Sequence, residues 1–176
     1  MHFTALVPAA LLALGGLAST SASPIEKRYT GVKIQSGRDS LCLQPFGAWT
    51  NGTTVGTIDC AQAASWNINP GSGSVILTGT TWALQAAGGG NTNNAGLQLW
   101  KSVPGTFAQT WYLTTDNRIA ITGGTQCLDE GDNGPQTYQC TTGNTNQAWN
   151  ILPASGTPPP NHTIGRVAQR AEATVA

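Results

Sequence analysis

A pattern of four short apolar segments recurs three times between residues 31 and 152, and it constrains the fold more than any other feature. The first segment of each copy holds an aliphatic residue, Ile34, Leu77 or Ile121, so the copies are 43 and 44 residues apart. A unit of this size cannot bury its own apolar face, and three such units must share one core. The spacing therefore predicts three similar subdomains around a common centre.

The segments have the character of β-strands. Large apolar residues alternate with other residues, as in Leu97 and Leu99, which is typical of half-buried strands. Gly and Pro account for 22 and 10 of the 176 residues, and many of them separate the segments as turns require. We therefore expect an all-β domain of twelve strands. A tryptophan recurs in the last segment of each copy, and we expect these three in the core: Trp66, Trp111 and Trp149.

Short motifs recur in register with the segments. They are Gln-x-Trp at residues 109–111 and 147–149, its degenerate form at 64–66, Cys-Leu-Asp at 127–129 and Gln-Leu-Trp at 98–100. Together these motifs resemble the ricin-B-type lectin repeat. The resemblance covers about residues 31–152 and implies a β-trefoil, in which three four-stranded repeats surround a pseudo-threefold axis. We place this domain at residues 29–152.

Four cysteines occupy matching positions of the first and third repeats. They are Cys42 and Cys60 in the first repeat, and Cys127 and Cys140 in the third. Three pairings are possible in principle, and the matching positions favour a disulfide within each repeat. The second repeat has Ala83 and Ser102 at these positions, and the joint loss of both partners is what a disulfide predicts. A zinc site is disfavoured because the domain contains no histidine and no Cys-x-x-Cys pair.

The third repeat holds the complete set of side chains that bind sugar in the family it resembles. The resemblance implies that the sugar-binding residues are Asp129, Gln136, Tyr138, Asn146 and Gln147. These groups suit a neutral polyol, because an aromatic face packs on the apolar face of a sugar ring. A carboxylate accepts strong hydrogen bonds from hydroxyls, and amides both donate and accept. A purely structural interpretation of each residue alone remains open: Asp129 capping a turn, Tyr138 in the core, and Asn146 shaping the loop.

The other two repeats have lost part of this set. A weaker second site is expected from four residues of the second repeat: Gln85, Gln98, Trp100 and Gln109. It keeps an aromatic face but has no acidic residue. The first repeat keeps only the amide of Gln44, and we expect no site there. Glu130 and Asp132, which follow Asp129, are expected to be solvated loop charges.

The sequence favours binding without catalysis, and without a cofactor or metal ion. The only histidines, His2 and His162, lie outside the domain, so the domain cannot contain a Ser-His-Asp catalytic triad. The resemblance implies galactose or N-acetylgalactosamine-type glycans, or a polysaccharide, as partners. Two alternatives remain: a β-trefoil protease inhibitor, and a carbohydrate-binding module that targets a partner enzyme to polysaccharide. A formal net charge of zero argues against nucleic acid.

The two ends of the chain differ in composition from the repeats. Residues 1–22 contain a short apolar run followed by small residues, as in a secretory signal peptide, and the run is too short to span a bilayer. Residues 23–28 read as a short pro-segment that ends in a dibasic site. Residues 153–176 read as a proline-rich linker and a disordered tail. We therefore expect a secreted, extracellular protein without membrane insertion.

Two acceptor motifs for N-glycosylation occur, at Asn51 and Asn161. Asn51 precedes the third strand of the first repeat. A glycan at this position is expected to cover the first repeat, which we do not expect to bind.

Overall fold

Twelve strands and three short 3-10 turns make up residues 28–153, the part of the chain that the computed structural model describes. The first repeat contains β1 (Tyr29–Ser36), β2 (Cys42–Pro45), β3 (Thr53–Ile58) and β4 (Trp66–Ile68). The second contains β5 (Ile76–Leu77), β6 (Trp82–Ala86), β7 (Ala95–Lys101) and β8 (Trp111–Leu113). The third contains β9 (Ile119–Ile121), β10 (Gln126–Gly131), β11 (Gly134–Gln139) and β12 (Trp149–Pro153). The turns are η1 (Ala87–Gly90), η2 (Phe107–Gln109) and η3 (Thr145–Gln147). The predicted all-β fold, with four strands in each repeat, is confirmed.

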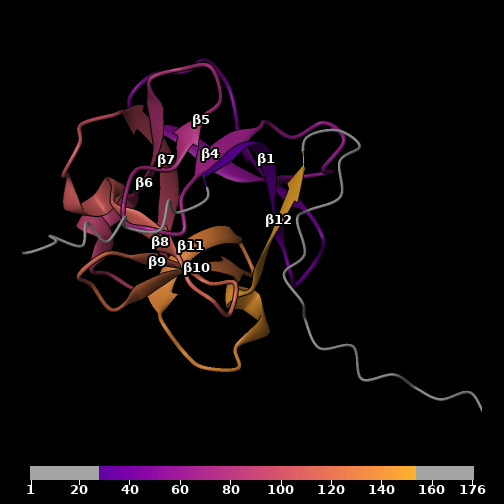
Figure 1. Cartoon of the computed structure of the whole chain (residues 1–176), viewed down its shortest axis with the longest axis vertical. Helices are drawn as coiled ribbons and strands as arrows, with labels where there is room; N and C mark the ends of the chain where they lie inside the picture. The colour runs from indigo at the N-terminus through magenta and orange to yellow at the C-terminus, as the bar shows by residue number, and fades with distance from the viewer. Residues whose placement is uncertain (1–27, 154–176) are drawn as a thin grey trace, which may run out of the picture.

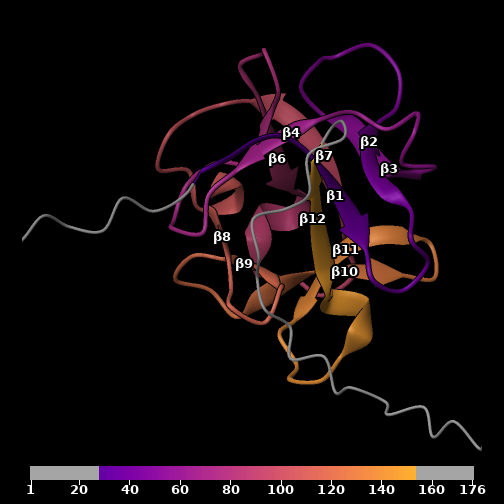
Figure 2. The ribbon, with the colours of Figure 1, turned by 45° about the vertical axis from the view of Figure 1, so that its right-hand side comes forward.

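Each repeat is built around an antiparallel pair of strands, β2/β3, β6/β7 or β10/β11. Neighbouring repeats join through these pairs, because β7 pairs with both β3 and β11. The described chain closes on itself where β12 runs antiparallel to β1, with Ile151 opposite Ile34. Figures 1 and 2 show β1 and β12 side by side, and the three repeats around a shared centre. This arrangement is a β-trefoil.

The three tryptophans of the last strands lie at the heart of this fold. Trp66, Trp111 and Trp149 are all at most 1% exposed. A buried indole N–H needs a partner, and each one donates to a leucine carbonyl on the second strand of its own repeat. The acceptors are the carbonyl oxygens of Leu43, Leu84 and Leu128, at 3.1, 3.0 and 3.0 Å. The same contact repeated three times ties the last strand of each repeat to its second strand.

Two disulfides connect the second strand of a repeat to the end of its third strand. Cys42 bonds to Cys60 in the first repeat, and Cys127 bonds to Cys140 in the third, with Cα–Cα distances of 4.9 Å in both. The predicted pairing within each repeat is thereby confirmed. Ala83 of the second repeat is fully buried at the matching position of β6, so the core continues there without a cross-link.

Several predicted features lie before or after the trefoil in the sequence. The signal peptide, the tail after Pro153, Asn161 and nearly all of the pro-segment lie outside the described residues. Within residues 28–153, no helix has the length and apolar character needed to cross a membrane.

Candidate functional site

A shallow pocket of about 230 Å³ opens on the third repeat. Side chains of β10, β11 and the η3 region form it, together with one side chain of the first repeat. The lining residues are Arg38, Asp129, Gly131, Asp132, Gln136, Tyr138, Asn144 and Asn146. Four of the five residues that the sequence assigned to sugar binding are therefore brought together here: Asp129, Gln136, Tyr138 and Asn146.

Asp129 is the acceptor group at the base of this pocket. Its side chain is 4% exposed and lies opposite Gln136 in the β10/β11 register. Gln136 Nε2 donates to Oδ1 at 3.4 Å, and Asn144 Nδ2 donates to Oδ2 at 3.2 Å. A carboxylate has about four lone-pair positions, so two long amide contacts leave it able to accept from a ligand.

Tyr138 provides the aromatic face of the pocket. It follows Gln136 by two residues on β11, so both side chains emerge on the same side of the strand. Tyr138 is 38% exposed, although large aromatic side chains usually bury more of their surface. The interpretation of Tyr138 as a core residue is therefore wrong, and its ring is accessible beside the buried carboxylate.

Asn144 is a pocket residue that the sequence analysis missed. It caps η3, because its Oδ1 accepts from the backbone N–H of Asn146 at 3.1 Å. The other end of the same amide donates to Asp129, so the cap fixes the orientation of the donor. The preference of asparagine for N-cap positions is the sequence signal that indicates this role.

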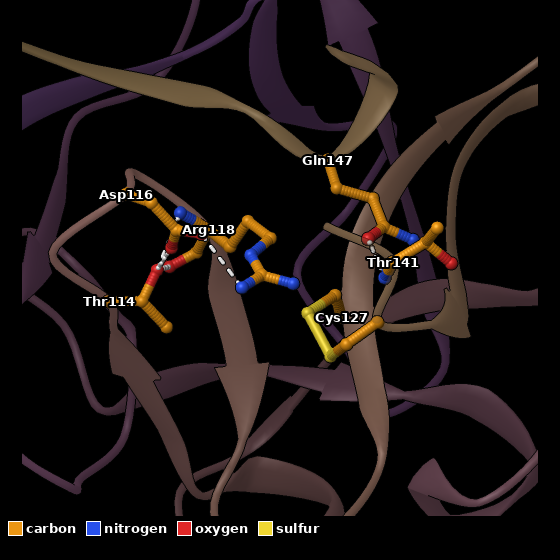
Figure 3. A network of polar contacts seen from close by, with 7 residues as sticks. Thr114, Asp116, Arg118, Cys127, Thr141 and Gln147 are labelled. Carbon is orange, nitrogen blue, oxygen red and sulfur yellow. Dashed lines mark hydrogen bonds and ion pairs between the residues drawn. A yellow bond between two sulfur atoms is a disulfide. The ribbon is translucent and has the colours of Figure 1, made fainter. Parts of the chain in front are cut away.

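Gln147 does not line the pocket, although the sequence grouped it with the sugar-binding residues. Its side chain is fully buried. Oε1 accepts from the backbone N–H of Thr141 at 2.9 Å, and Nε2 donates to the carbonyl of Gln139 at 2.9 Å. Figure 3 shows the amide facing Thr141, close to the disulfide of Cys127. Gln147 therefore fastens the end of β11 to η3.

Gln109 makes the equivalent contacts in the second repeat. It is 1% exposed, and its Oε1 accepts from the backbone N–H of Val103 at 2.9 Å. Its Nε2 donates to the carbonyl of Lys101 at 3.2 Å and to Gln85 Oε1 at 2.8 Å. Gln109 is therefore a structural clip, and it also occupies the acceptor oxygen of Gln85.

The remaining residues of the expected second site share one face of β6 and β7. Gln85 lies opposite Gln98, and Ala83 lies opposite Trp100. Trp100 and Gln98 are both partly exposed, so the aromatic face persists. Ala108, which is buried, stands where the third repeat has Asn146. The second repeat thus keeps a stacking surface but has no carboxylate on it.

Phe46 occupies the corresponding region of the first repeat. A side-chain carbon added at Gly56 would lie 2.7 Å from Phe46 Cε2, so the ring packs directly on the glycine backbone. Gln44 is also engaged, because its Oε1 accepts from the backbone N–H of Ala64. The polar anchors of the third repeat are replaced here by an aromatic cover and a structural amide.

Arg38 brings a positive charge to the pocket from the β1–β2 loop of the first repeat. Its Nη1 donates to the carbonyl of Glu130 at 2.8 Å, and its Nη2 pairs with Asp132 at 2.5 Å. The Asp132 side chain is 87% exposed, as expected for a solvated loop charge. The hydrogen bond that Arg38 donates to Asp132 and the surrounding acidic charges raise the pKa of the Arg38 guanidinium. No repeat motif predicted this residue, because it reaches the pocket across a boundary between repeats.

Glu130 lies behind the pocket, and the expectation that it is solvated is wrong. It is 2% exposed, and its Oε1 accepts from Thr57 Oγ1 of the first repeat at 3.2 Å. Its Oε2 is buried without a hydrogen-bond partner among the described residues. Burial, the largest effect, and the nearby Asp39 charge together raise the pKa of this carboxyl to about 7, against the opposing effect of Thr57.

Metal coordination has no visible support in the part of the chain that the structure covers. Among residues 28–153, no group of three or more His, Cys, Asp or Glu side chains is placed to hold a metal ion. The chemistry available in the pocket is hydrogen bonding by a carboxylate and amides, beside an aromatic ring.

Comparison with known proteins decides the family. The ricin-type β-trefoil lectin domain matches residues 30–150, which is more than half of the chain. The chain belongs to this family. No curated protein sequence matches the chain significantly.

Solved structures with similar folds include an agglutinin, an R-type lectin and a designed protein. The agglutinin of Abrus precatorius matches with a TM-score of 0.57 at 16% identity, over 77% of this chain and 51% of its own. The C-half of an earthworm R-type lectin, in complex with GalNAc, matches with a TM-score of 0.55 at 17% identity, over 70% of this chain and 98% of its own. The designed threefold-symmetric protein ThreeFoil matches with a TM-score of 0.58 at 15% identity, over 69% of this chain and 96% of its own. At these identities the likeness supports the ricin-type trefoil fold itself.

Proposed function

We propose that this ricin-type β-trefoil protein is a secreted lectin that binds galactose-type sugars through the third-repeat pocket, without catalysis. The observation that carries the proposal is the pairing of a buried carboxylate, Asp129, with an accessible aromatic ring, Tyr138, in one pocket. The family supports carbohydrate binding in general. The GalNAc bound by the earthworm lectin supports the choice of sugar class.

The geometry of the pocket supports a specific binding mode for the sugar. Two neighbouring sugar hydroxyls donate to Asp129, while the amides of Gln136, Asn144 and Asn146 complete the hydrogen bonds at its rim. The apolar face of the ring packs on Tyr138. One shallow site of this kind predicts a dissociation constant on the order of 0.1–1 mM, or about −4 to −5.5 kcal/mol. Gln147 supports the pocket from behind by holding η3 against β11.

Replacing Asp129 by asparagine tests the proposal with little change of shape. Asp129→Asn removes the charge and one acceptor oxygen, and we expect it to abolish binding on a glycan array. Asp59→Asn is a matched control, because Asp59 is an exposed carboxylate of the first repeat that only holds the backbone N–H of Ala61. The control variant should bind galactose-type glycans as the wild type does.

The array also separates the alternatives. Binding that survives in the folded Asp129→Asn variant contradicts the assignment of the site. A folded wild-type domain that binds no glycan contradicts the lectin function, and a protease-inhibition panel then tests the inhibitor alternative. Preference for polysaccharide over short glycans instead identifies a carbohydrate-binding module.

A further inference from the structure

Two loops of the trefoil dock on the next repeat in the same way. Asn51, in the β2–β3 loop, accepts a hydrogen bond through Oδ1 from the backbone N–H of Lys101 on β7, at 2.8 Å. Asn93, in the β6–β7 loop, accepts through Oδ1 from the backbone N–H of Gln139 on β11, at 2.9 Å. The residue after each asparagine donates its backbone N–H to the same strand, at 3.0 and 2.8 Å. Asn51 and Asn93 are therefore structural equivalents.

Each of these asparagines stands beside the aromatic residue of the repeat on which it docks. Lys101 directly follows Trp100 of the second repeat, and Gln139 directly follows Tyr138 of the third. The next residue after Asn51, Gly52, faces Trp100 closely enough that an added side-chain carbon would lie 3.8 Å from Trp100 Cζ3. The sequence led us to expect a glycan on Asn51 over the first repeat, whereas the structure shows that Asn51 also borders Trp100 of the second repeat.

The two asparagines differ in one chemical respect. Asn51-Gly52-Thr53 is an acceptor sequence for N-glycosylation, whereas Asn93 is followed two residues later by Ala95 and is not. Asn51 is exposed, and its Oδ1 is already directed at the Lys101 backbone. Its Nδ2, the atom that carries an N-linked glycan, lies on the other side of the amide carbon. A glycan therefore leaves the hydrogen bond of the loop intact.

We propose that Asn51 carries an N-linked glycan that lies over Trp100, so that the protein's own carbohydrate covers the second repeat while the third stays open. The proposal rests on the secretion and the third-repeat sugar site proposed above. In the modification, Asn51 Nδ2 forms a bond to C1 of an oligosaccharide carried on a lipid pyrophosphate. The C1–O bond to the pyrophosphate breaks, the lipid pyrophosphate leaves with the electron pair, and Nδ2 loses one proton.

The physical basis for covering Trp100 is local. The first sugar starts one residue away from the glycine that flanks the indole ring, so its effective concentration at the ring is high without any added linker. The indole of Trp100 is a broad, partly exposed aromatic face on which the apolar face of a sugar can pack. The second repeat has no carboxylate to select another ligand, because Gln85 replaces the acidic residue and is bonded to Gln109.

The first test uses the full chain secreted from a eukaryotic host. Peptide mass spectrometry should find a glycan on the Asn51 peptide that peptide N-glycosidase removes, converting the modified asparagine to aspartate. An unmodified Asn51 in the secreted chain overturns the proposal. This result does not depend on sugar binding, so it stays separate from the outcome of the lectin test.

The second test asks whether the glycan covers the indole. Asn51→Asp removes the glycan but keeps the oxygen that accepts from Lys101. Acrylamide quenching of tryptophan fluorescence is measured in each protein with and without Trp100→Phe, and the difference is the contribution of Trp100. This contribution should be small in the glycosylated protein and larger in Asn51→Asp. Equal quenching in both, with Asn51 modified, overturns the covering of Trp100.

The third test introduces a glycan at the equivalent position beside the third repeat. Ala95→Thr completes an acceptor sequence at Asn93, the equivalent position beside Tyr138. The glycosylated variant should lose galactose binding, whereas the same variant made without glycosylation should bind as the wild type does. Unchanged binding by the variant with a glycan on Asn93 overturns the idea that this position shields the neighbouring face. If the wild type binds no sugar, the lectin function fails, and the first two tests still decide the glycan.

Discussion

Asp129 is buried but remains available to a ligand because of what surrounds it. Its two hydrogen-bond donors are neutral amides, Gln136 and Asn144, at 3.4 and 3.2 Å. Hydrogen bonds to a carboxylate are strong when they are short, so contacts of this length leave room for better donors. Sugar hydroxyls can replace or supplement the amides without breaking an ion pair. A carboxylate that is 4% exposed can therefore still accept from the ligand that we propose for this pocket.

Glu130, the next residue, makes stability depend on pH. Burial raises its pKa from the ordinary value of 4.5 to about 7, with Asp39 and Asp129 acting in the same direction and Thr57 and Arg38 opposing it. At a pH between these two pKa values, the folded protein binds more protons than the unfolded chain. Folding stability is therefore highest below pH 4.5 as far as this group is concerned, and it falls as pH rises through about 7.

Denaturant unfolding at pH 5 and pH 8 checks this prediction. We expect the wild type to lose on the order of 1–3 kcal/mol between the two, since one pKa unit corresponds to about 1.4 kcal/mol. Glu130→Gln should remove most of the difference. Asp116, whose pKa is lowered by its contacts with Arg118 and Thr114, loses its contribution only as pH falls below its ordinary 3.8, outside this window. A variant that keeps the full pH dependence contradicts the role of Glu130.

Variants of Gln147 and Gln136 test whether the support of the pocket and the binding of sugar belong to different residues. Gln147→Ala leaves the backbone N–H of Thr141 and the carbonyl of Gln139 without their side-chain partner, and we expect a loss of about 1–3 kcal/mol in the free energy of unfolding. Gln136→Ala, at the partly exposed pocket rim, should weaken sugar binding with little effect on stability. Urea denaturation and calorimetric titration of both variants measure the two quantities. The reverse pattern places Gln147 in the site after all.

At the scale of the elements, the β10/β11 hairpin carries the acceptor and the aromatic face on strands that face each other over six residue pairs. Its far end is held by the Cys127–Cys140 disulfide and by the hydrogen bonds of the buried Gln147 side chain to the backbone of Thr141 and Gln139. The same hairpin therefore sets the distance between Asp129 and Tyr138. Its rigidity is expected to matter for binding as well as for folding.

The two disulfides allow this expectation to be tested with an internal control. Replacing Cys127 and Cys140 together by alanine should reduce stability by about 3 kcal/mol and weaken sugar binding as well. Replacing Cys42 and Cys60 should cost a similar amount of stability but leave binding unchanged, because that disulfide lies in the first repeat. Thermal unfolding and titration at a temperature where both variants are folded measure the effects. Equal loss of binding in both contradicts a local role for the third-repeat disulfide.

At the scale of the whole molecule, threefold repetition made the fold predictable. The spacing of Ile34, Leu77 and Ile121 predicted three matching units. The tryptophan that recurs in each unit was expected in the core, and the structure places all three indoles against equivalent leucine carbonyls. The cysteine positions predicted the pairing because they follow the same repetition. A feature that recurs in register can be predicted from the sequence, because the equivalent positions of the three repeats can be compared.

The site was predicted less completely, for reasons that are also physical. Arg38 and Glu130 meet across repeats, 92 residues apart in the chain, and no local pattern encodes that contact. The burial of Gln147 was not foreseen, because a motif gives the residue type but not the direction in which its amide points. Asn144 was missed because its role depends on the cap of η3 rather than on any repeat signature.

One repeat of the three is proposed to bind sugar, and an NMR titration of galactose into isotope-labelled protein can locate the binding site. We expect the backbone and side-chain signals of β10, β11 and η3 to shift, with those of Tyr138 and Gln136 shifting most. The indole signal of Trp100 should stay unchanged, and Asp129→Asn should abolish the shifts. Shifts centred on Trp100, or on the exposed Phe46 and Trp49 of the first repeat, would contradict the assignment of binding to the third repeat.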